Sequence, residues 1–259
     1  MSLDTIINHT LYTIDDDSFQ KECRHKLQQD GALVLPNFLT EECIAQVVAE
    51  GKQQMHLAYY TEDRHNVYLK ESDPDFDKGH ARNRLVDSSK GCITDDFIPS
   101  NSPLRRLYDA PTFRKFLAEV LEEQQLYNYA DPLSSINLHY ASEGQELGWH
   151  FDNSSFAITL LLQKPEQGGH FQYIPNMRNS AQVDMNYTGV EAVLNSQTPV
   201  QQLDIDPGSL VLFRGRDAIH RVTPTIGDTT RMLVVLAYNS APNIELSESA
   251  RMTFYGRLN

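Results

Sequence analysis

The chain has 259 residues and a formal charge of −13, with 35 acidic against 22 basic side chains. This charge argues against a nucleic-acid partner, because phosphate binding needs a positive field. Hydrophobic residues make up 40% of the sequence, no apolar run is long enough to cross a bilayer, and the start lacks a secretion signal, so we expect a cytoplasmic protein without membrane contact.

The length suits a single domain over 1–259, with a mainly helical part, 1–125, before a β-rich core. A helical pattern over 17–29 ends at Gly31 and is followed by the strand-like "ALVLPNF". Thr40 offers an N-cap to a second helix, because Glu41 and Glu42 follow it in the first turn.

Residues 60–102 are polar and show no clear periodicity, which predicts an irregular, lid-like loop. After this loop, Pro111 opens another helix. Apolar residues Phe113, Phe116 and Leu117 give that helix a buried stripe. We therefore expect the N-terminal helices to cover a sheet.

Residues 126–241 contain eight short β-like runs separated by turns, and 242–259 form a C-terminal tail. Runs at this spacing are typical of an antiparallel jelly roll or barrel, so the predicted fold class is α+β with a mainly β core. In "SSINLHYA", Asn137 and His139 point to one face while apolar residues point to the other. A polar inner face indicates a functional barrel interior.

The segment "GWHFDNSSF" places His150 two residues before Asp152, so both side chains lie on the same side of a strand. Such a pair arises by chance about once in a chain of this composition. Downstream, "DAIHRVTPTIGDTTRMLVVL" supplies His220 and, eleven positions later, Arg231. Two imidazoles and one carboxylate form the facial triad that holds Fe(II) in non-haem oxygenases.

With these residues the sequence resembles the Fe(II)- and 2-oxoglutarate-dependent oxygenases of the double-stranded β-helix fold, over about 126–241. The resemblance implies metal ligation by His150, Asp152 and His220, with 2-oxoglutarate and O2 as cosubstrates. It also implies that Arg231 binds the distal carboxylate of 2-oxoglutarate, which guanidinium geometry suits. Family members often carry Ser or Thr two places after this arginine, whereas Leu233 stands here.

The segment "YADPLSSINLHYASEGQELGWHFDNSSFAITLLLQ" resembles the branch that hydroxylates or halogenates free amino acids. Halogenases of that branch have a small residue in place of the metal carboxylate, where chloride binds. Asp152 fills this position here, so the resemblance implies hydroxylation of a small-molecule substrate, a free amino acid or a similar molecule.

Several other residues are candidate ligands. Asn137 and His139 face the predicted interior and are expected near the cosubstrate. Arg82 and Arg84, in the polar loop, are candidates for binding a substrate carboxylate, with solvated loop arginines as the alternative. The remaining candidates for substrate contact are Asn153 and Asn239.

Two other functions remain open at this point. One is a peptide or protein side-chain hydroxylase of the prolyl hydroxylase type, with the acidic loop as a docking surface. The other is a catalytically silent, cupin-like barrel that binds metal or a small ligand. The sequence also leaves a homo-oligomer open.

Overall fold

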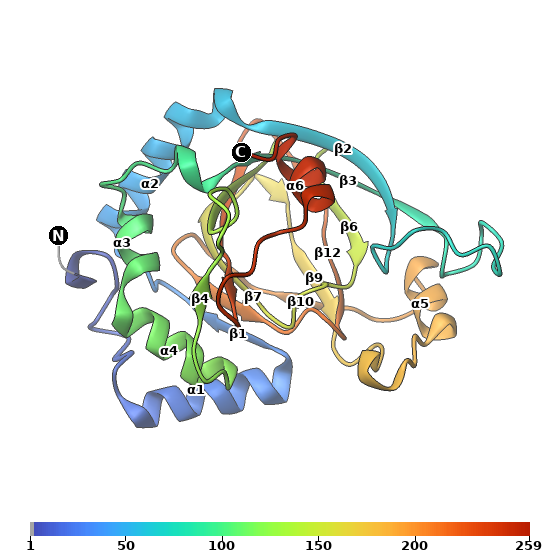
Figure 1. The fold of residues 1–259 in the computed structure, drawn as a ribbon, viewed down its shortest axis with the longest axis horizontal. Helices are drawn as coiled ribbons and strands as arrows, with labels where there is room; N and C mark the ends of the chain where they lie inside the picture. The colour runs from blue at the N-terminus through green and yellow to red at the C-terminus, as the bar shows by residue number, and fades with distance from the viewer. Residues whose placement is uncertain (1–2) are drawn as a thin grey trace.

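A computed structural model describes residues 3–259, and most of its strands join one sheet of eleven that curls into a nearly closed antiparallel jelly roll (Figure 1). The predicted fold class is confirmed. The α-helices are α1 (Asp17–Asp30), α2 (Glu41–Gln54), α3 (Pro103–Asp109), α4 (Pro111–Leu121), α5 (Tyr187–Leu194) and α6 (Glu248–Tyr255).

The strands among the described residues range in length from two to nine residues. They are β1 (Ala32–Leu35), β2 (Tyr59–Asn66), β3 (Leu85–Ile93), β4 (Tyr127–Asn128), β5 (Ile136–Ala141), β6 (Leu147–His150), β7 (Ala157–Gln163), β8 (Gln167–Gly168), β9 (Phe171–Ile174), β10 (Gln201–Leu203), β11 (Leu210–Phe213), β12 (Ile219–Val222), β13 (Thr225–Ile226), β14 (Arg231–Leu236) and β15 (Tyr238–Asn239).

Strand β3 connects the two halves of the sheet. One half has the order β1-β11-β7-β14-β5 and the other β6-β12-β9-β10. Residues Gly91–Ile93 of β3 pair with β5, whereas Ser88 pairs with Leu147 of β6. The barrel therefore bends between its two halves at β3.

Helices α1 to α4 lie on one side of the barrel, against the outer face of the first half of the sheet (Figure 1). The main hydrophobic cluster lies between them and contains Leu27 of α1, Val47 of α2, Phe116 of α4 and Leu138 of β5. These four side chains are at most 1% exposed. The N-terminal helices thus supply the core that holds the sheet in place, as the sequence predicts.

The predicted helix boundaries follow from local chemistry. The Thr40 hydroxyl accepts a hydrogen bond from Cys43 N and caps α2. Gly31 ends α1 in the left-handed conformation, at φ 71°, and its N–H donates to the Leu27 carbonyl. Pro111 stands in the first turn of α4, where its missing N–H costs nothing.

The irregular loop expected over 60–102 is wrong over 60–66 and 85–93, which lie in β2 and β3. Strands β2 and β3 pair over eight residues, and only residues 67–84, the β2–β3 loop, connect them. The apolar alternation that marks a strand is missing because β2 lies at the edge of the sheet with most of its side chains exposed. Backbone pairing with β3 decides its structure instead.

The chain after residue 126 also departs from expectation at two places. Helix α5 is inserted within the β core, and α6 forms within the expected tail. Among the described residues, no helix is both long and apolar enough to pass through a bilayer.

Candidate metal and active site

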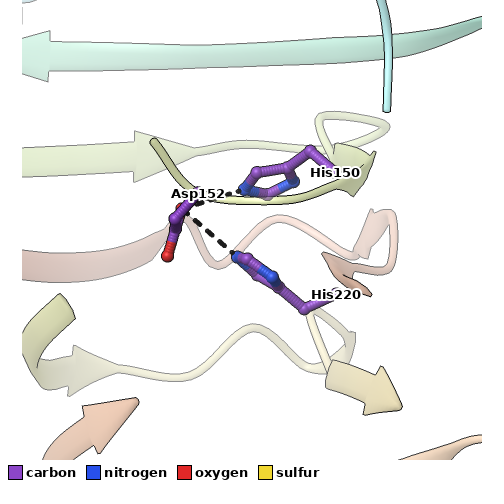
Figure 2. A group of neighbouring side chains, drawn as sticks. All are labelled: His150, Asp152 and His220. Atoms are coloured by element: carbon purple, nitrogen blue, oxygen red, sulfur yellow. Dashed lines mark ion pairs between the residues drawn. The ribbon is translucent and has the colours of Figure 1, made fainter. Parts of the chain in front are cut away.

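The two histidines and the aspartate of the predicted triad lie together inside the barrel (Figure 2). His150 ends β6 and is the direct cross-strand partner of His220 in β12. Asp152 follows on the segment after β6, and its Oδ1 lies 3.7 Å from His150 Nε2 and 3.5 Å from His220 Nε2. All three ligand atoms fall within 4.8 Å of one another, which is close enough for one metal ion.

Backbone carbonyls fix both imidazoles in the form that binds metal. His150 Nδ1 lies 2.8 Å from the Gly148 carbonyl, and His220 Nδ1 lies 3.0 Å from the Ala218 carbonyl. An Nδ1–H donated to a carbonyl leaves the Nε2 lone pair free. Both Nε2 atoms face Asp152, so the free lone pairs converge on one point.

Gly215 makes the room that the Asp152 carboxylate needs. A Cβ at Gly215 would collide with Asp152 Oδ2, and the Gly215 carbonyl accepts from Asp152 N at 3.1 Å. Oδ2 is itself buried and has no hydrogen-bond partner among the described residues. A buried carboxylate oxygen without a partner fits a metal ligand, and two imidazoles with one carboxylate are the donors of the Fe(II) facial triad.

Burial and neighbouring groups set the charge states of His150 and Asp152. It lowers the pKa of His150 to about 3, with the neighbouring His220 acting in the same direction. Burial alone raises the pKa of Asp152, but the two imidazoles outweigh it and the pKa lies below its usual value. At neutral pH His150 is therefore neutral and Asp152 ionised, as metal ligands must be.

Arg231 is a buried cation to which the described residues offer no acidic partner. It begins β14, pairs with Ala141 and is 8% exposed. Burial alone lowers its pKa to about 10, so the guanidinium stays charged. In the part of the chain that the structure describes, its side chain has no ion pair and no hydrogen bond. An unpaired buried charge is costly, which favours an anionic ligand as its partner.

The chain matches the family model of Halogenase D over residues 14–254. It belongs to the Halogenase D family. No curated protein sequence is similar enough to count as a match. The family match, the fold and the triad together confirm the predicted relationship to the Fe(II)- and 2-oxoglutarate-dependent oxygenases.

Solved structures of low sequence identity share the fold of this Halogenase D family member. An oxidoreductase of the 2OG-Fe(II) oxygenase family from Burkholderia pseudomallei is 13% identical, with a TM-score of 0.56 over 89% of this chain and 95% of that one. A prolyl hydroxylase from Trichoplax adhaerens, in complex with a hypoxia inducible factor peptide fragment, is 13% identical, with a TM-score of 0.57 over 92% and 96%. The epimerase SnoN, in complex with Fe3+, alpha ketoglutarate and nogalamycin RO, is 11% identical, with a TM-score of 0.56 over 86% and 84%.

The structure gives Asn137 and His139 different environments. The Asn137 amide donates to the Leu133 and Ile136 carbonyls, and its Oδ1 accepts from Tyr255 of α6 at 2.9 Å. These bonds already satisfy the amide, so a cosubstrate contact of Asn137 stays a prediction. Burial, then Lys90 and Arg231, lower the pKa of His139 well below 6.5, so it is a neutral imidazole beside Arg231.

The two loop arginines are engaged outside the triad. Arg82 donates to the Glu71 carbonyl at 2.9 Å and lies over the Tyr68 ring. Arg84 donates to Asn195 Oδ1 at 2.6 Å and to the Leu194 carbonyl at 3.2 Å, at the end of α5. These contacts tie the β2–β3 loop to itself and to α5, and substrate binding by either arginine stays a prediction.

The two predicted asparagine contacts also lie apart from the triad ligands. Asn153 is exposed, and its carbonyl accepts from Arg216 at 3.1 Å. Asn239 was expected to continue the inward face of a regular strand from Arg231, but β14 ends at Leu236 and β15 pairs separately with β4. The Asn239 Nδ2 atom is buried without a partner among the described residues, so a polar ligand for it stays a prediction.

Sequence reasoning missed two residues of the site. Gly215 stands in "FRGRD", where only the collision with Asp152 reveals its purpose. Lys90 lies on β3 within the segment that was read as irregular, so its direction was not predicted. A weak signal for Lys90 is the β-compatible "LVDSSKGCI" around it.

Proposed function

We propose that this chain hydroxylates an unactivated C–H bond of a free amino acid or a similar small polar molecule, with Fe(II), 2-oxoglutarate and O2. The observation that carries the proposal is the complete triad, in which the ligand atoms of His150, Asp152 and His220 lie within 4.8 Å of one another. When bound, the iron with 2-oxoglutarate and O2 inserts one oxygen atom into the substrate and the other into succinate, with release of CO2.

The residues of the chain would bind the iron and 2-oxoglutarate and shield them from water. His150, Asp152 and His220 would hold the iron by one face, which leaves the other coordination positions free. Arg231 would take a carboxylate of 2-oxoglutarate, since its buried guanidinium has no side-chain hydrogen bond or ion pair within the described chain. The rings of Phe171 and Phe213 pack on His220, at centroid distances of 5.5 and 4.8 Å, and would exclude water from that side of the site.

The carboxylate of Asp152 also bears on the choice between hydroxylation and halogenation. Halogenation is the second candidate, since the chain belongs to the Halogenase D family. A halide needs a free metal position on the ligand side, and Asp152 fills it. We therefore expect hydroxylation from the natural chain even when chloride is abundant.

A substrate panel tests this proposal. The iron-loaded protein is incubated with 2-oxoglutarate, chloride and each of the twenty amino acids in turn, and with proline-containing peptides. Mass spectrometry should show a gain of one oxygen atom in an amino acid, with one succinate per product. Chlorinated product would support halogenation, modified peptide only would support the prolyl hydroxylase type, and no substrate-dependent succinate would support a silent barrel.

An Asp152→Gly variant sharpens the same experiment. Removal of the carboxylate leaves two protein ligands, so hydroxylation should be lost. Chlorination by this variant would show that the vacated position accepts halide. If the variant still hydroxylated at the natural rate, Asp152 would not be a metal ligand.

A further inference from the structure

A second cation, Lys90, points into the barrel from β3. Cys92 of β3 pairs with His139 of β5, so these two side chains share a face of the sheet. Lys90 lies two residues before Cys92 and therefore points to the same face. It is only partly accessible to solvent.

Lys90 and Arg231 stand in one row across three adjacent strands. Arg231 of β14 pairs with Ala141 of β5. Cys92 pairs with His139, so two residues further along the same antiparallel register Lys90 lies opposite Ala141 from the other side. Strands lie about 4.8 Å apart, so the backbones of the two cations are about 10 Å apart. Ala141, which lies between them in the row, has only a methyl side chain.

The Lys90 ammonium has no acidic partner among residues 3–259. Within residues 3–259 it forms neither an ion pair nor a side-chain hydrogen bond, and its only assigned contact is with the Phe254 ring of α6, at 5.4 Å. Burial lowers the pKa of Lys90, and the carboxylate of Asp152 in the triad acts in the opposite direction. Lys90 is thus a partly buried cation on the same face of the sheet as His139, and no anion among the described residues balances it.

We propose that Lys90 binds a second carboxylate inside the barrel, distinct from the one that Arg231 takes. This inference rests on the proposed function, whose reactants carry such a group at two places. One is the keto acid end of 2-oxoglutarate, and the other is the carboxylate of a free amino acid. An ammonium is a compact point charge that suits either.

Two keto acids separate the ends of the cosubstrate. 2-Oxoglutarate has both carboxylates, whereas 2-oxobutanoate has the keto acid end alone. Binding is measured with Zn(II) in place of iron, so that no turnover occurs, by calorimetry and by the fluorescence of Trp149. This residue is the single tryptophan of the chain, is 7% exposed and is adjacent to His150.

The variant is Lys90→Met, with Lys115→Met, an exposed lysine of α4, as the matched control. If Lys90 binds the keto acid end, Lys90→Met lowers the affinity for both keto acids about ten- to a hundredfold, which corresponds to the loss of one charge-assisted hydrogen bond. Lys115→Met should lower the affinity for neither. Arg231→Gln should weaken 2-oxoglutarate alone. If Lys90→Met lowered the affinity for 2-oxoglutarate alone, the proposal would be overturned, because Lys90 would then bind the same carboxylate as Arg231.

A substrate arm covers the second source. The amino acid that the wild-type protein turns over fastest is compared with its carboxamide. If Lys90 binds the substrate carboxylate, Lys90→Met raises KM for the acid about ten- to a hundredfold and leaves that of the amide unchanged. The proposal is overturned if Lys90→Met leaves both the affinity for the keto acids and KM for the amino acid unchanged. It is also overturned if the affinity for the keto acids is unchanged and the wild type turns over no amino acid. Absence of turnover alone would count only against the proposed function.

Thermal unfolding separates a binding role from a structural one. Removal of an unpaired buried charge should leave Tm of the metal-free protein unchanged or higher. A fall in Tm together with normal binding would make Lys90 a structural residue and overturn the proposal. Lys90→Arg keeps the charge and should recover part of the lost affinity, which guards against a folding defect in the methionine variant.

Discussion

The two faces of strand β5 show how the barrel separates stability from chemistry. On the outer face Ile136, Leu138 and Tyr140 are at most 1% exposed and pack in the main hydrophobic cluster beneath the helices. On the inner face, His139 lies between the charges of Lys90 and Arg231. The outer face gains free energy by excluding water, whereas the inner face holds charges at a cost to folding.

This contrast predicts that substitutions on the two faces have different readouts. Outer-face changes should lower the free energy of unfolding and leave ligand affinity intact. Inner-face changes should remove metal or ligand binding with little loss of stability, since unpaired polar groups contribute little to folding.

The largest effect is expected at the metal. His220→Ala removes one of three ligands, and loss of a residue that only orients a ligand already costs about ten- to a hundredfold in affinity. We expect Fe(II) affinity to fall by more than about a hundredfold and turnover to reach background. Metal titration followed by calorimetry measures this, with unfolding of the metal-free protein as the control. A variant that binds Fe(II) normally would exclude His220 as a ligand.

The matching change on the outer face is Leu138→Ala. Leu138 is 1% exposed beneath α2, and truncation of such a leucine costs about 2–5 kcal/mol through lost burial and the cavity left behind. Urea unfolding should show this loss, while Fe(II) affinity of the folded variant stays at the wild-type value. A large fall in metal affinity would mean that the two faces are coupled through the strand.

The same contrast explains which strands and which site residues could be predicted from the sequence. The eight β runs after residue 126 all contain strands, and the runs that form β5, β7, β11 and β14 carry regular apolar residues on their outer faces against the helices. His150, Asp152 and His220 could be predicted as a set, since metal ligation demands particular residue types at particular spacings.

The strand and the site residues that could not be predicted lack such local signals in the sequence. Strand β2 is an edge strand with exposed side chains, so its identity depends on pairing with β3 and not on its own pattern. Gly215 and Lys90 matter through neighbours more than sixty positions away, Asp152 in both cases. Contacts at that separation are decided by the topology of the barrel.

A smaller effect is expected from the pH dependence of stability. Burial, reinforced by Lys90 and Arg231, holds the folded pKa of His139 well below its unfolded value of 6.5. Below that pH the unfolded chain takes up a proton that the folded chain does not, so stability falls as pH falls, by up to about 1.4 kcal/mol per pH unit. His139→Gln should flatten the change in unfolding free energy between about pH 6 and about pH 5 by that amount. Equal slopes in both proteins would place a charged imidazole at this position.

The smallest expected effect concerns Arg84, which tests the β2–β3 loop as an anchored element against its predicted role in substrate binding. Arg84→Gln removes the hydrogen bonds to Asn195 and Leu194 at the end of α5, and we expect a loss of about 1 kcal/mol or less. Limited proteolysis within residues 67–84 should become faster, while KM for the amino acid is unchanged. Arg64→Gln is the control, because its ion pair with Asp87 lies in solvent, with side chains 64% and 72% exposed. If KM rose and the rate of proteolysis stayed as in the wild type, Arg84 would be a substrate ligand. The β2–β3 loop would then take part in binding, as the inner face of the barrel does.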